Sequence, residues 1–295
     1  MIEDHGVIAA AVTPRARNGD IDFGATFELI DHFCRAGLRG IAFFTESGEY
    51  PAFGIEERAR LVHLAAKRSR VPVFAGAGAM SLDDSVHLAR EAWSAGACAV
   101  LLPPPHFYRY AQDEIRDYYL EFSGQMPKDS VVFIANTPAV TTPIEPATLL
   151  SLLEDGRFAG VQDPGTEENG FFAGGRIAWL AGDDAAAARA RTAGACGVVS
   201  PAANAVPELV QALDCAVRSG NGAEAARLDG LLQEFHSRAL GFAQPVILKV
   251  AAGMRGIKVG PPPVPVSPER QRMLDEFRDW FRGWLPAVTK SKAHA

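Results

Sequence analysis

The stretch Phe158-Ala159-Gly160-Val161-Gln162-Asp163 is a short, mostly apolar run that ends on two polar residues. A run of this length and composition is typical of a buried strand. Other short apolar runs lie before and after it, and segments with a helical spacing of apolar residues separate them. The chain is therefore predicted to alternate between strands and helices.

Eight strands are predicted in this way. They span residues 6–14, 40–45, 71–78, 99–103, 130–136, 158–163, 176–183 and 197–200. Buried strands that alternate with helices at a spacing of about 25 residues are typical of a closed (β/α)8 TIM barrel, which belongs to the α/β class. An open, doubly wound sheet is the alternative, but no G-x-G-x-x-G motif opens the first predicted helix. The sequence thus favours the barrel.

After about Gly220 the pattern changes, and only helices are predicted. They span residues 223–240, 245–254 and 268–284, and the proline-rich segment 260–265 between the last two is expected to be extended. The polar tail from Pro286 is expected to fray. We therefore expect a barrel over residues 1–220 and a C-terminal three-helix extension over residues 221–295 that packs on it.

The composition is that of an ordinary globular protein, with 48% hydrophobic and 22% charged residues. A net charge of -6 argues against nucleic-acid binding, which requires clustered Lys and Arg. No apolar run approaches the ~20 residues of a membrane span, and the acidic N-terminus differs from a basic signal peptide. The four cysteines form no C-x-x-C pair, which favours buried thiols over a metal or redox motif. We expect a cytoplasmic protein with no metal or cofactor.

In a (β/α)8 barrel the functional site lies at the carboxyl ends of the strands. The candidate residues at the predicted strand ends are Thr13, Thr45, Glu46, Ser47, Glu49, Gly76, Gly78, Asn136, Thr137, Gln162, Asp163, Gly182, Asp183, Asp184, Ser200 and Asn204, with the segment 103–110. The loop at residues 44–51 combines hydroxyls, a glycine and backbone N–H groups, which suits a small carboxylate. An ordinary turn that caps the next helix fits these residues equally well.

This loop resembles the G-T-T-G-E-x-x loop of the dihydrodipicolinate synthase / N-acetylneuraminate lyase family, since it reads Thr45-Glu46-Ser47-Gly48-Glu49-Tyr50-Pro51. Residues 9–14, 73–78 and 181–184 resemble the family's first, third and seventh strands. Residues 197–200, with Asn204 and Pro207, resemble its eighth. The similarity runs from about residue 6 to residue 284, and the chain is identified as a divergent member of that family.

The resemblance implies a (β/α)8 barrel that acts on pyruvate or a related 2-keto acid. Family members are mostly aldolases or lyases whose strand-six lysine condenses with the keto group to form an iminium. A tyrosine on strand five relays protons, helped by a hydroxyl of the strand-two loop and by a tyrosine that crosses a dimer interface. The partners implied are a small carboxylate ligand and a second copy of the chain, in a homodimer or homotetramer.

Several positions depart from the family's pattern. The strand-six motif G-[IV]-K-[DE] matches Gly160-Val161-Gln162-Asp163, so Gln162 stands at the position of the lysine. The strand-five motif Tyr-Asn-x-Pro matches residues 135–138, so Ala135 stands at the position of the tyrosine. Glu46 stands at the first threonine of the strand-two loop, while Ser47 keeps the second hydroxyl.

The strand-four loop departs as well. Its Pro-Tyr-Tyr matches Pro105-His106-Phe107, which removes both tyrosines unless Tyr108 or Tyr110 substitutes. An arginine that some members carry after strand five falls at about Val140. By resemblance, the catalytic positions are Gln162, Ala135, Ser47 and Glu46, and the ligand-binding positions are Ser47, Gly48, Asn136, Gln162, Gly182 and Val199.

No other lysine is placed to replace the missing one. The six lysines are Lys67, Lys128, Lys249, Lys258, Lys290 and Lys292, and none lies at the carboxyl end of a predicted strand. A glutamine amide is a poor nucleophile, because its nitrogen lone pair is delocalised, but it donates and accepts hydrogen bonds. Schiff-base chemistry is therefore predicted to be lost.

Three interpretations remain open. In the first, the protein binds a 2-keto or hydroxy acid and performs other chemistry, with Glu46, Glu49, His106 and Asp163 as acid–base groups. In the second, Glu46, Asp163 and Asp183 hold a divalent cation that polarises the keto acid. In the third, the protein is a non-catalytic paralogue that binds a small acid or supports an assembly.

Overall fold

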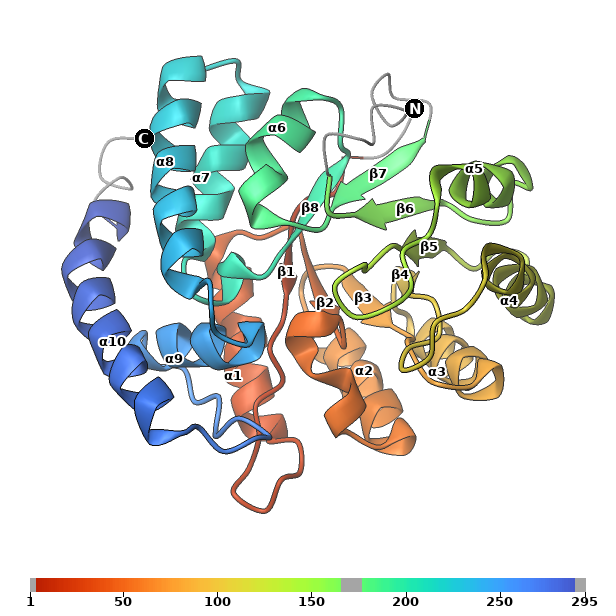
Figure 1. Ribbon diagram of the computed structural model, residues 1–295, viewed down its shortest axis with the longest axis horizontal. Helices are drawn as coiled ribbons and strands as arrows, with labels where there is room; N and C mark the ends of the chain where they lie inside the picture. Colours follow the sequence, from red (N-terminus) through yellow and green to blue (C-terminus); the bar gives the residue numbers. More distant parts are fainter. Residues whose placement is uncertain (1–3, 166–176, 290–295) are drawn as a thin grey trace.

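Eight parallel strands close into a barrel in the computed structural model, which describes residues 4–165 and 177–289 (Figure 1). The strands follow one another around the barrel in chain order, and the last pairs with the first. They are β1 (Gly6–Ala10), β2 (Gly40–Phe43), β3 (Val73–Gly76), β4 (Ala99–Leu102), β5 (Val132–Ala135), β6 (Gly160–Asp163), β7 (Ala178–Ala181) and β8 (Gly197–Ser200). The predicted TIM barrel is confirmed.

The helices of the barrel follow the strands as the periodicity predicted. They are α1 (Phe23–Ala36), α2 (Ile55–Arg68), α3 (Leu82–Ala95), α4 (Gln112–Gln125), α5 (Pro146–Glu154), α6 (Ala187–Thr192) and α7 (Pro207–Arg218). Local signals set their ends: Ser81 accepts a hydrogen bond from Asp84 N at the start of α3, and Gly96 ends it in the left-handed conformation. The glycine-rich segment predicted after strand six lies largely outside the described residues.

Alternate strand residues face the interior of the barrel. A cluster that includes Ile8, Ala42, Phe74, Leu101, Phe133, Ala135, Leu180 and Val199 fills it, while the neighbouring strand residues pack outward against the helices. In the strand register, Ala135 pairs with Gln162 and Gln162 pairs with Leu180. Since paired residues of parallel strands point the same way, Gln162 faces the interior and Asp163 faces the helices.

Three helices follow the barrel: α8 (Gly222–Ala239), α9 (Gln244–Met254) and α10 (Pro268–Thr289). They lie together on the side of the barrel that carries α1 and α7, away from α3 to α5 (Figure 1). The sequence predicted that α10 ends at residue 284, but it continues through Pro286, because Val288 is buried in the same apolar face as Trp284. The division at residue 220 stays a prediction.

The apolar helices of this fold are short or interrupted by charges. Within residues 4–165 and 177–289, no helix has the length and hydropathy needed to cross a membrane.

Candidate functional site

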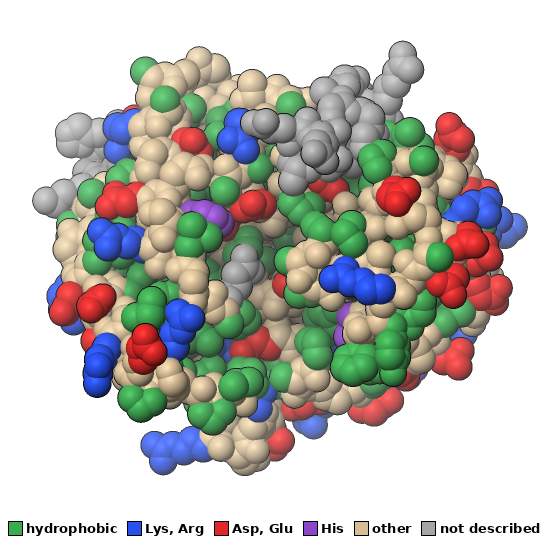
Figure 2. Space-filling model, in the orientation of Figure 1, with side chains coloured by type: hydrophobic (Ala, Val, Ile, Leu, Met, Phe, Trp, Pro, Cys, Tyr) green, Lys and Arg blue, Asp and Glu red, His purple; other side chains and the backbone are tan. Residues whose placement is uncertain are grey.

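The carboxyl ends of the strands enclose a small cavity at the mouth of the barrel. Its walls are Phe44, Thr45, Glu46, Tyr50, Gly76, Leu101, Pro103, Ala135, Thr137 and Gln162. The cavity has a volume of about 20 Å³, which is enough for about one water molecule. Figure 2 shows this face of the molecule hollowed near its centre, with acidic side chains beside the hollow. The structure thus brings Gln162, Ala135 and Glu46 together at one cavity, and their functional roles stay predictions.

Gln162 supplies an amide to this cavity from the end of β6. The residue is only 6% exposed, and no hydrogen bond to its side chain is found in the described part of the chain. Gly182, at the end of β7, leaves space for it, because a Cβ on Gly182 would lie 3.2 Å from Gln162 Nε2. The amide is therefore available to a ligand. Gly182 has no side chain with which to bind that ligand, and its role here is to leave space for the Gln162 amide.

The strand-two loop carries Glu46 into the cavity. It forms two short 3-10 helices, η1 (Glu46–Gly48) and η2 (Tyr50–Ala52), separated by Glu49 in the left-handed conformation with φ of 54°. Thr13 Oγ1 donates to Gly48 O at 2.7 Å and fixes the loop to β1. Ser47 and Gly48 of this loop are buried, and neither lines the cavity.

Glu49 anchors the same loop to the C-terminal helices. Its Oε2 forms an ion pair with Lys249 Nζ of α9, and both side chains are at most 5% exposed. Burial lowers the pKa of Lys249, while Glu49 raises it. Glu49 is thus a structural anchor in this arrangement and does not face the cavity, contrary to the acid–base role considered for it.

Glu46 is the carboxyl group of the cavity. Burial, and secondly the negative charge of Asp183, raise its pKa to about 7. Asp183 lies at the end of β7, where its side chain accepts from Ala185 N at 2.9 Å. Near neutral pH, Glu46 therefore exists in both protonated and ionised forms and can donate or accept a proton.

Asp184 links the ends of β7 and β8 from beneath the site. Ser200 Oγ donates to Oδ1, and Ala202 N donates to Oδ2 at 2.6 Å. Burial raises the pKa of Asp184 to about 7, although these two hydrogen bonds lower it. Asn204, which follows β8, connects it to β1 in a similar way, since its Nδ2 donates a hydrogen bond to Ala10 O at 2.7 Å. These residues hold the strand ends together, while Val199 is packed inside the barrel.

Asp163 and Asn136 lie on the outer side of the barrel. Asn136 Nδ2 donates to Asp163 Oδ2 at 2.8 Å, and Asn136 Oδ1 accepts from Ile144 N at 3.0 Å. Asp163 Oδ1 accepts from Gly165 N at 2.9 Å. These contacts orient the loops after β5 and β6. The alternation of side chains along each strand turns Asn136 and Asp163 away from the cavity, and neither belongs to its lining. Ligand binding by Asn136 and an acid–base or cation-binding role for Asp163 stay predictions.

Glu46, Asp163 and Asp183 consequently do not converge on one point. Within residues 4–165 and 177–289, no group of three or more His, Cys, Asp or Glu side chains is arranged to hold a metal ion.

Tyr50 and Arg58 are site residues that the sequence reasoning missed. Tyr50 lines the cavity, and the guanidinium of Arg58 packs on its ring at 5.1 Å and donates to Gly76 O at 3.1 Å. Burial raises the pKa of Tyr50 to about 12 and lowers that of Arg58 to about 10. The signal for Arg58 in the sequence is its position among apolar residues on the inward face of α2, where an arginine is unusual.

The strand-four loop lies beside Tyr50. Tyr50 Oη and His106 Nδ1 are 3.4 Å apart, and burial, together with Arg58, lowers the pKa of His106. Phe107 has a positive φ of 83° and is 77% exposed, and Tyr108 is 60% exposed. Neither Tyr108 nor Tyr110 lines the cavity.

Known proteins resemble this chain in sequence and in fold. The model of the "Dihydrodipicolinate synthetase family" matches residues 3–281. A 4-hydroxy-tetrahydrodipicolinate synthase of Marinobacter nauticus is 30% identical over 282 residues, which cover 93% of this chain and 96% of that protein. The solved 4-hydroxy-tetrahydrodipicolinate synthase of Methylacidiphilum fumariolicum SolV has a TM-score of 0.86 at 27% identity and covers 97% of this chain and 98% of that chain.

YagE, a prophage protein of the same family from E. coli K12, was solved in complex with pyruvate. It has a TM-score of 0.83 at 23% identity, covering 94% of this chain and 98% of that chain. At 23% identity, the similarity of the two structures supports the fold alone.

Proposed function

The chain belongs to the dihydrodipicolinate synthetase family, and on that premise we propose that it binds a small 2-keto or hydroxy acid at the mouth of its barrel without forming an iminium. The observation that carries this proposal is Gln162, which faces the cavity from β6 beside Ala135. We infer that Gln162 occupies the position of the family's lysine. Its amide cannot attack a carbonyl, but it can hydrogen-bond to one.

Glu46 is the acid–base group of the proposed site. Because its pKa is about 7, a protonated Glu46 is present to donate a hydrogen bond to the ligand's carboxylate or keto oxygen. The ionised form can accept a proton from the carbon next to the keto group. Pyruvate in the YagE complex supports a keto acid as the ligand class.

A non-catalytic, ligand-binding paralogue is the second candidate, and one observation favours it. The cavity of about 20 Å³ is smaller than any keto acid, so a ligand must displace side chains or lie above them. Without a lysine at the cavity, Glu46 and Tyr50 would be the remaining groups for proton transfer among the described residues, and burial raises the pKa of Tyr50 to about 12. A protein that binds without turnover is consistent with these facts.

Reduction with borohydride in the presence of pyruvate tests the loss of iminium chemistry. We expect no mass increase of any lysine by mass spectrometry, because none lines the cavity. A lysine adduct at the barrel would contradict the proposal. In parallel, a set of 2-keto and 2-hydroxy acids is screened for an increase in melting temperature, since a ligand that binds only the folded state stabilises it.

The Glu46→Gln variant separates the two candidates. If Glu46 transfers protons, this variant retains ligand binding but loses proton exchange at the ligand's C3, followed by NMR in D₂O. If the wild type shows binding without such exchange, the protein is the non-catalytic paralogue. No binding of any 2-keto or hydroxy acid would overturn both.

We also propose a homodimer whose interface covers the exposed side chains of the strand-four loop and of the adjacent segment around Val140. Phe107 and Tyr108 contact each other, and a bridge between His106 and Thr141 brings Val140, which is 49% exposed, to the same edge. Light scattering after size exclusion is expected to give twice the chain mass. Phe107→Asp should shift the mass toward the monomer, whereas Leu240→Asp, at an equally apolar exposed position elsewhere, should not.

A further inference from the structure

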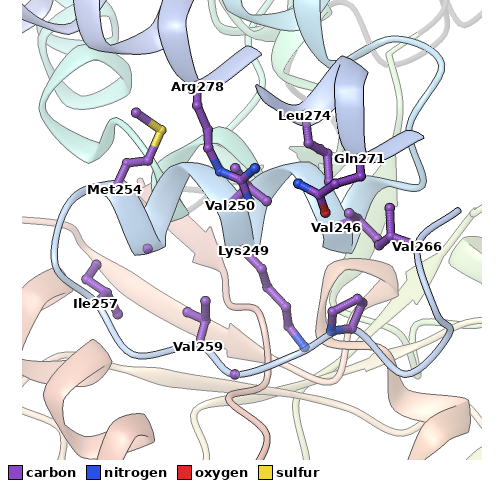
Figure 3. A pocket seen from close by; sticks show the side chains of 13 residues that line it. Val246, Lys249, Val250, Met254, Ile257, Val259, Val266, Gln271, Leu274 and Arg278 are labelled. Atoms are coloured by element: carbon purple, nitrogen blue, oxygen red, sulfur yellow. The ribbon is translucent and has the colours of Figure 1, made fainter. Parts of the chain in front are cut away.

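A second, larger cleft lies between α9, α10 and the strap, which is the segment of residues 255–267 that joins them (Figure 3). Its volume of about 520 Å³ falls within the range of small-molecule sites. Aliphatic side chains make most of its wall: Val246, Val250, Met254, Ile257, Val259, Val266 and Leu274. It is distinct from the barrel mouth, since the two share no lining residue among those described.

The strap is fixed in place, so the cleft is a permanent feature of the fold. Arg15 N donates to Val259 O at 3.1 Å, which ties the strap to the loop after β1. Gly260 has a positive φ of 68° and lies so close to Arg15 that a Cβ would be 1.8 Å from Arg15 O. The prolines that follow keep the strap extended.

The charged side chains of the cleft are both cationic. Lys249 extends from α9 toward the strap, and Arg278 enters from α10 (Figure 3). No Asp or Glu belongs to the described lining, although each cation has an acidic partner outside it, Glu49 for Lys249 and Asp275 for Arg278. An apolar wall with two cations favours an anion that carries an apolar body.

The surroundings of Lys249 strengthen this charge argument. Its ammonium has three donors, and Glu49 is its one acceptor within the described residues. The nearby Arg15 adds positive charge, and a buried Nη1 of Arg15 lacks a hydrogen-bond partner. Lys249 therefore lies near one carboxylate, Glu49, and near a second, half-buried cation, Arg15, whose positive charge favours an anion in the cleft.

We propose that this cleft binds a small amphipathic carboxylate, with its anionic head toward Lys249 and Arg278 and its apolar body against the aliphatic wall. Lys249 also pairs with Glu49 of the strand-two loop, so one residue of the cleft contacts the loop that carries Glu46. Binding in the cleft changes the charge next to Glu49 and is thereby coupled to the loop at residues 45–52.

Isothermal titration with octanoate tests the site without any keto acid. Octanol carries the apolar body without the anion, and acetate carries the anion without the body. We expect octanoate to bind with one site per chain and octanol and acetate to bind at least tenfold more weakly. Equal binding of octanol would show a nonspecific apolar surface and would overturn the proposal, as would no binding of octanoate.

Two pairs of variants locate the binding. Gly253→Phe fills the cleft from an exposed helical position where an added Cβ meets no atom within 4 Å, and Gly230→Phe makes the same change on α8. Arg278→Gln removes one of the two cleft cations. Arg282→Gln removes a cation one turn further along α10, which pairs with Asp279 as Arg278 pairs with Asp275. Octanoate should bind at least tenfold more weakly to the first member of each pair and unchanged to the second. Unchanged binding by both cleft variants would place octanoate elsewhere.

Amide hydrogen exchange tests the coupling. Octanoate should change the exchange rates at residues 45–52 in the wild type and in Gly230→Phe, but not in Gly253→Phe. Octanoate binding that leaves this loop unaffected would contradict the coupling, whichever ligand the barrel mouth binds.

Discussion

Gln162 and Glu46 line the same small cavity, so the chemistry of the barrel mouth depends on one amide and one carboxyl group. The amide is neutral at every ordinary pH, whereas the carboxyl changes its charge near pH 7 because burial and Asp183 raise its pKa. A cavity with this pair has no nucleophilic amine but keeps a proton donor. Two predictions follow from the two residues.

The first prediction concerns Gln162→Lys. A lysine at this position would lie near Glu46, whose negative charge stabilises the ammonium over the neutral amine that attacks a carbonyl. Ala135 also offers no hydroxyl for proton relay. We expect no pyruvate-dependent cleavage above background in a coupled aldolase assay. The double variant Gln162→Lys/Ala135→Tyr serves as the comparison, and robust turnover by the single variant would show that the site has been misjudged.

The second prediction concerns pH. Because the pKa of Glu46 is raised from 4.5 to about 7, Glu46 retains its proton up to near neutrality. A ligand carboxylate should therefore bind more tightly below pH 7 than above it, by up to about tenfold per pH unit while Glu46 titrates. Titration calorimetry from pH 6 to 8 measures this slope. The slope should vanish in Glu46→Gln and persist in Glu56→Gln, whose side chain is 87% exposed.

At the scale of elements, the strand-two loop is held from three directions. Thr13 bonds Gly48, Lys249 of α9 pairs with Glu49, and Arg58 of α2 packs on Tyr50. The loop carries no long helix of its own, so these contacts determine where Glu46 lies. The buried ion pair joins the C-terminal helices to this loop.

The third prediction is that removing one partner of this pair is costly. Lys249→Met leaves Glu49 as an unpaired buried charge, which should lower the free energy of unfolding by about 3–5 kcal/mol. Lys249→Met/Glu49→Leu removes both charges and should recover much of that loss. Urea denaturation measures both. The exposed pair Lys258–Glu28 is the control, and Lys258→Met should change stability by less than about 1 kcal/mol; a similar loss in both lysine variants would contradict the argument.

At the scale of the whole molecule, the C-terminal helices and the barrel share one apolar core. Phe235 of α8 contacts Phe281 and Trp284 of α10, and α8 packs in turn on α7. The apolar faces of α8 and α10 would be exposed to water if the helices separated from the barrel. We therefore propose that residues 221–295 are an extension that folds with the barrel and not an independent domain.

The fourth prediction follows from this shared core. Phe281 is fully buried, and Phe281→Ala should lower the free energy of unfolding by about 3–5 kcal/mol while unfolding remains a single transition. Far-UV and near-UV circular dichroism should report the same midpoint. Met273→Ala, at a position that is 36% exposed on the same helix, should have little effect. Two separate transitions in Phe281→Ala would indicate that the extension unfolds by itself.

Much of the fold could be predicted from local patterns. Short apolar runs placed the eight strands, and Ser81 and Gly96 marked the ends of α3 as capping residues do. The strands were predicted too long at several ends, because residues such as Val12 and Ala77 are as apolar as strand residues but belong to buried loops. The sequence pattern predicts that the last helix ends before Pro286, yet the helix continues past it, because Val288 is buried.

The barrel, the family and the residue at the end of strand six follow from the sequence, since they depend on periodicity and motif order along the chain. That Gln162 faces the cavity while Asp163 faces the helices follows from the folded structure, because strand register sets which side chains converge. The folded structure also decided the pKa of Glu46 and the pairing of Glu49 with Lys249. Burial and contacts between residues far apart in the chain produce these properties, and no local pattern encodes either.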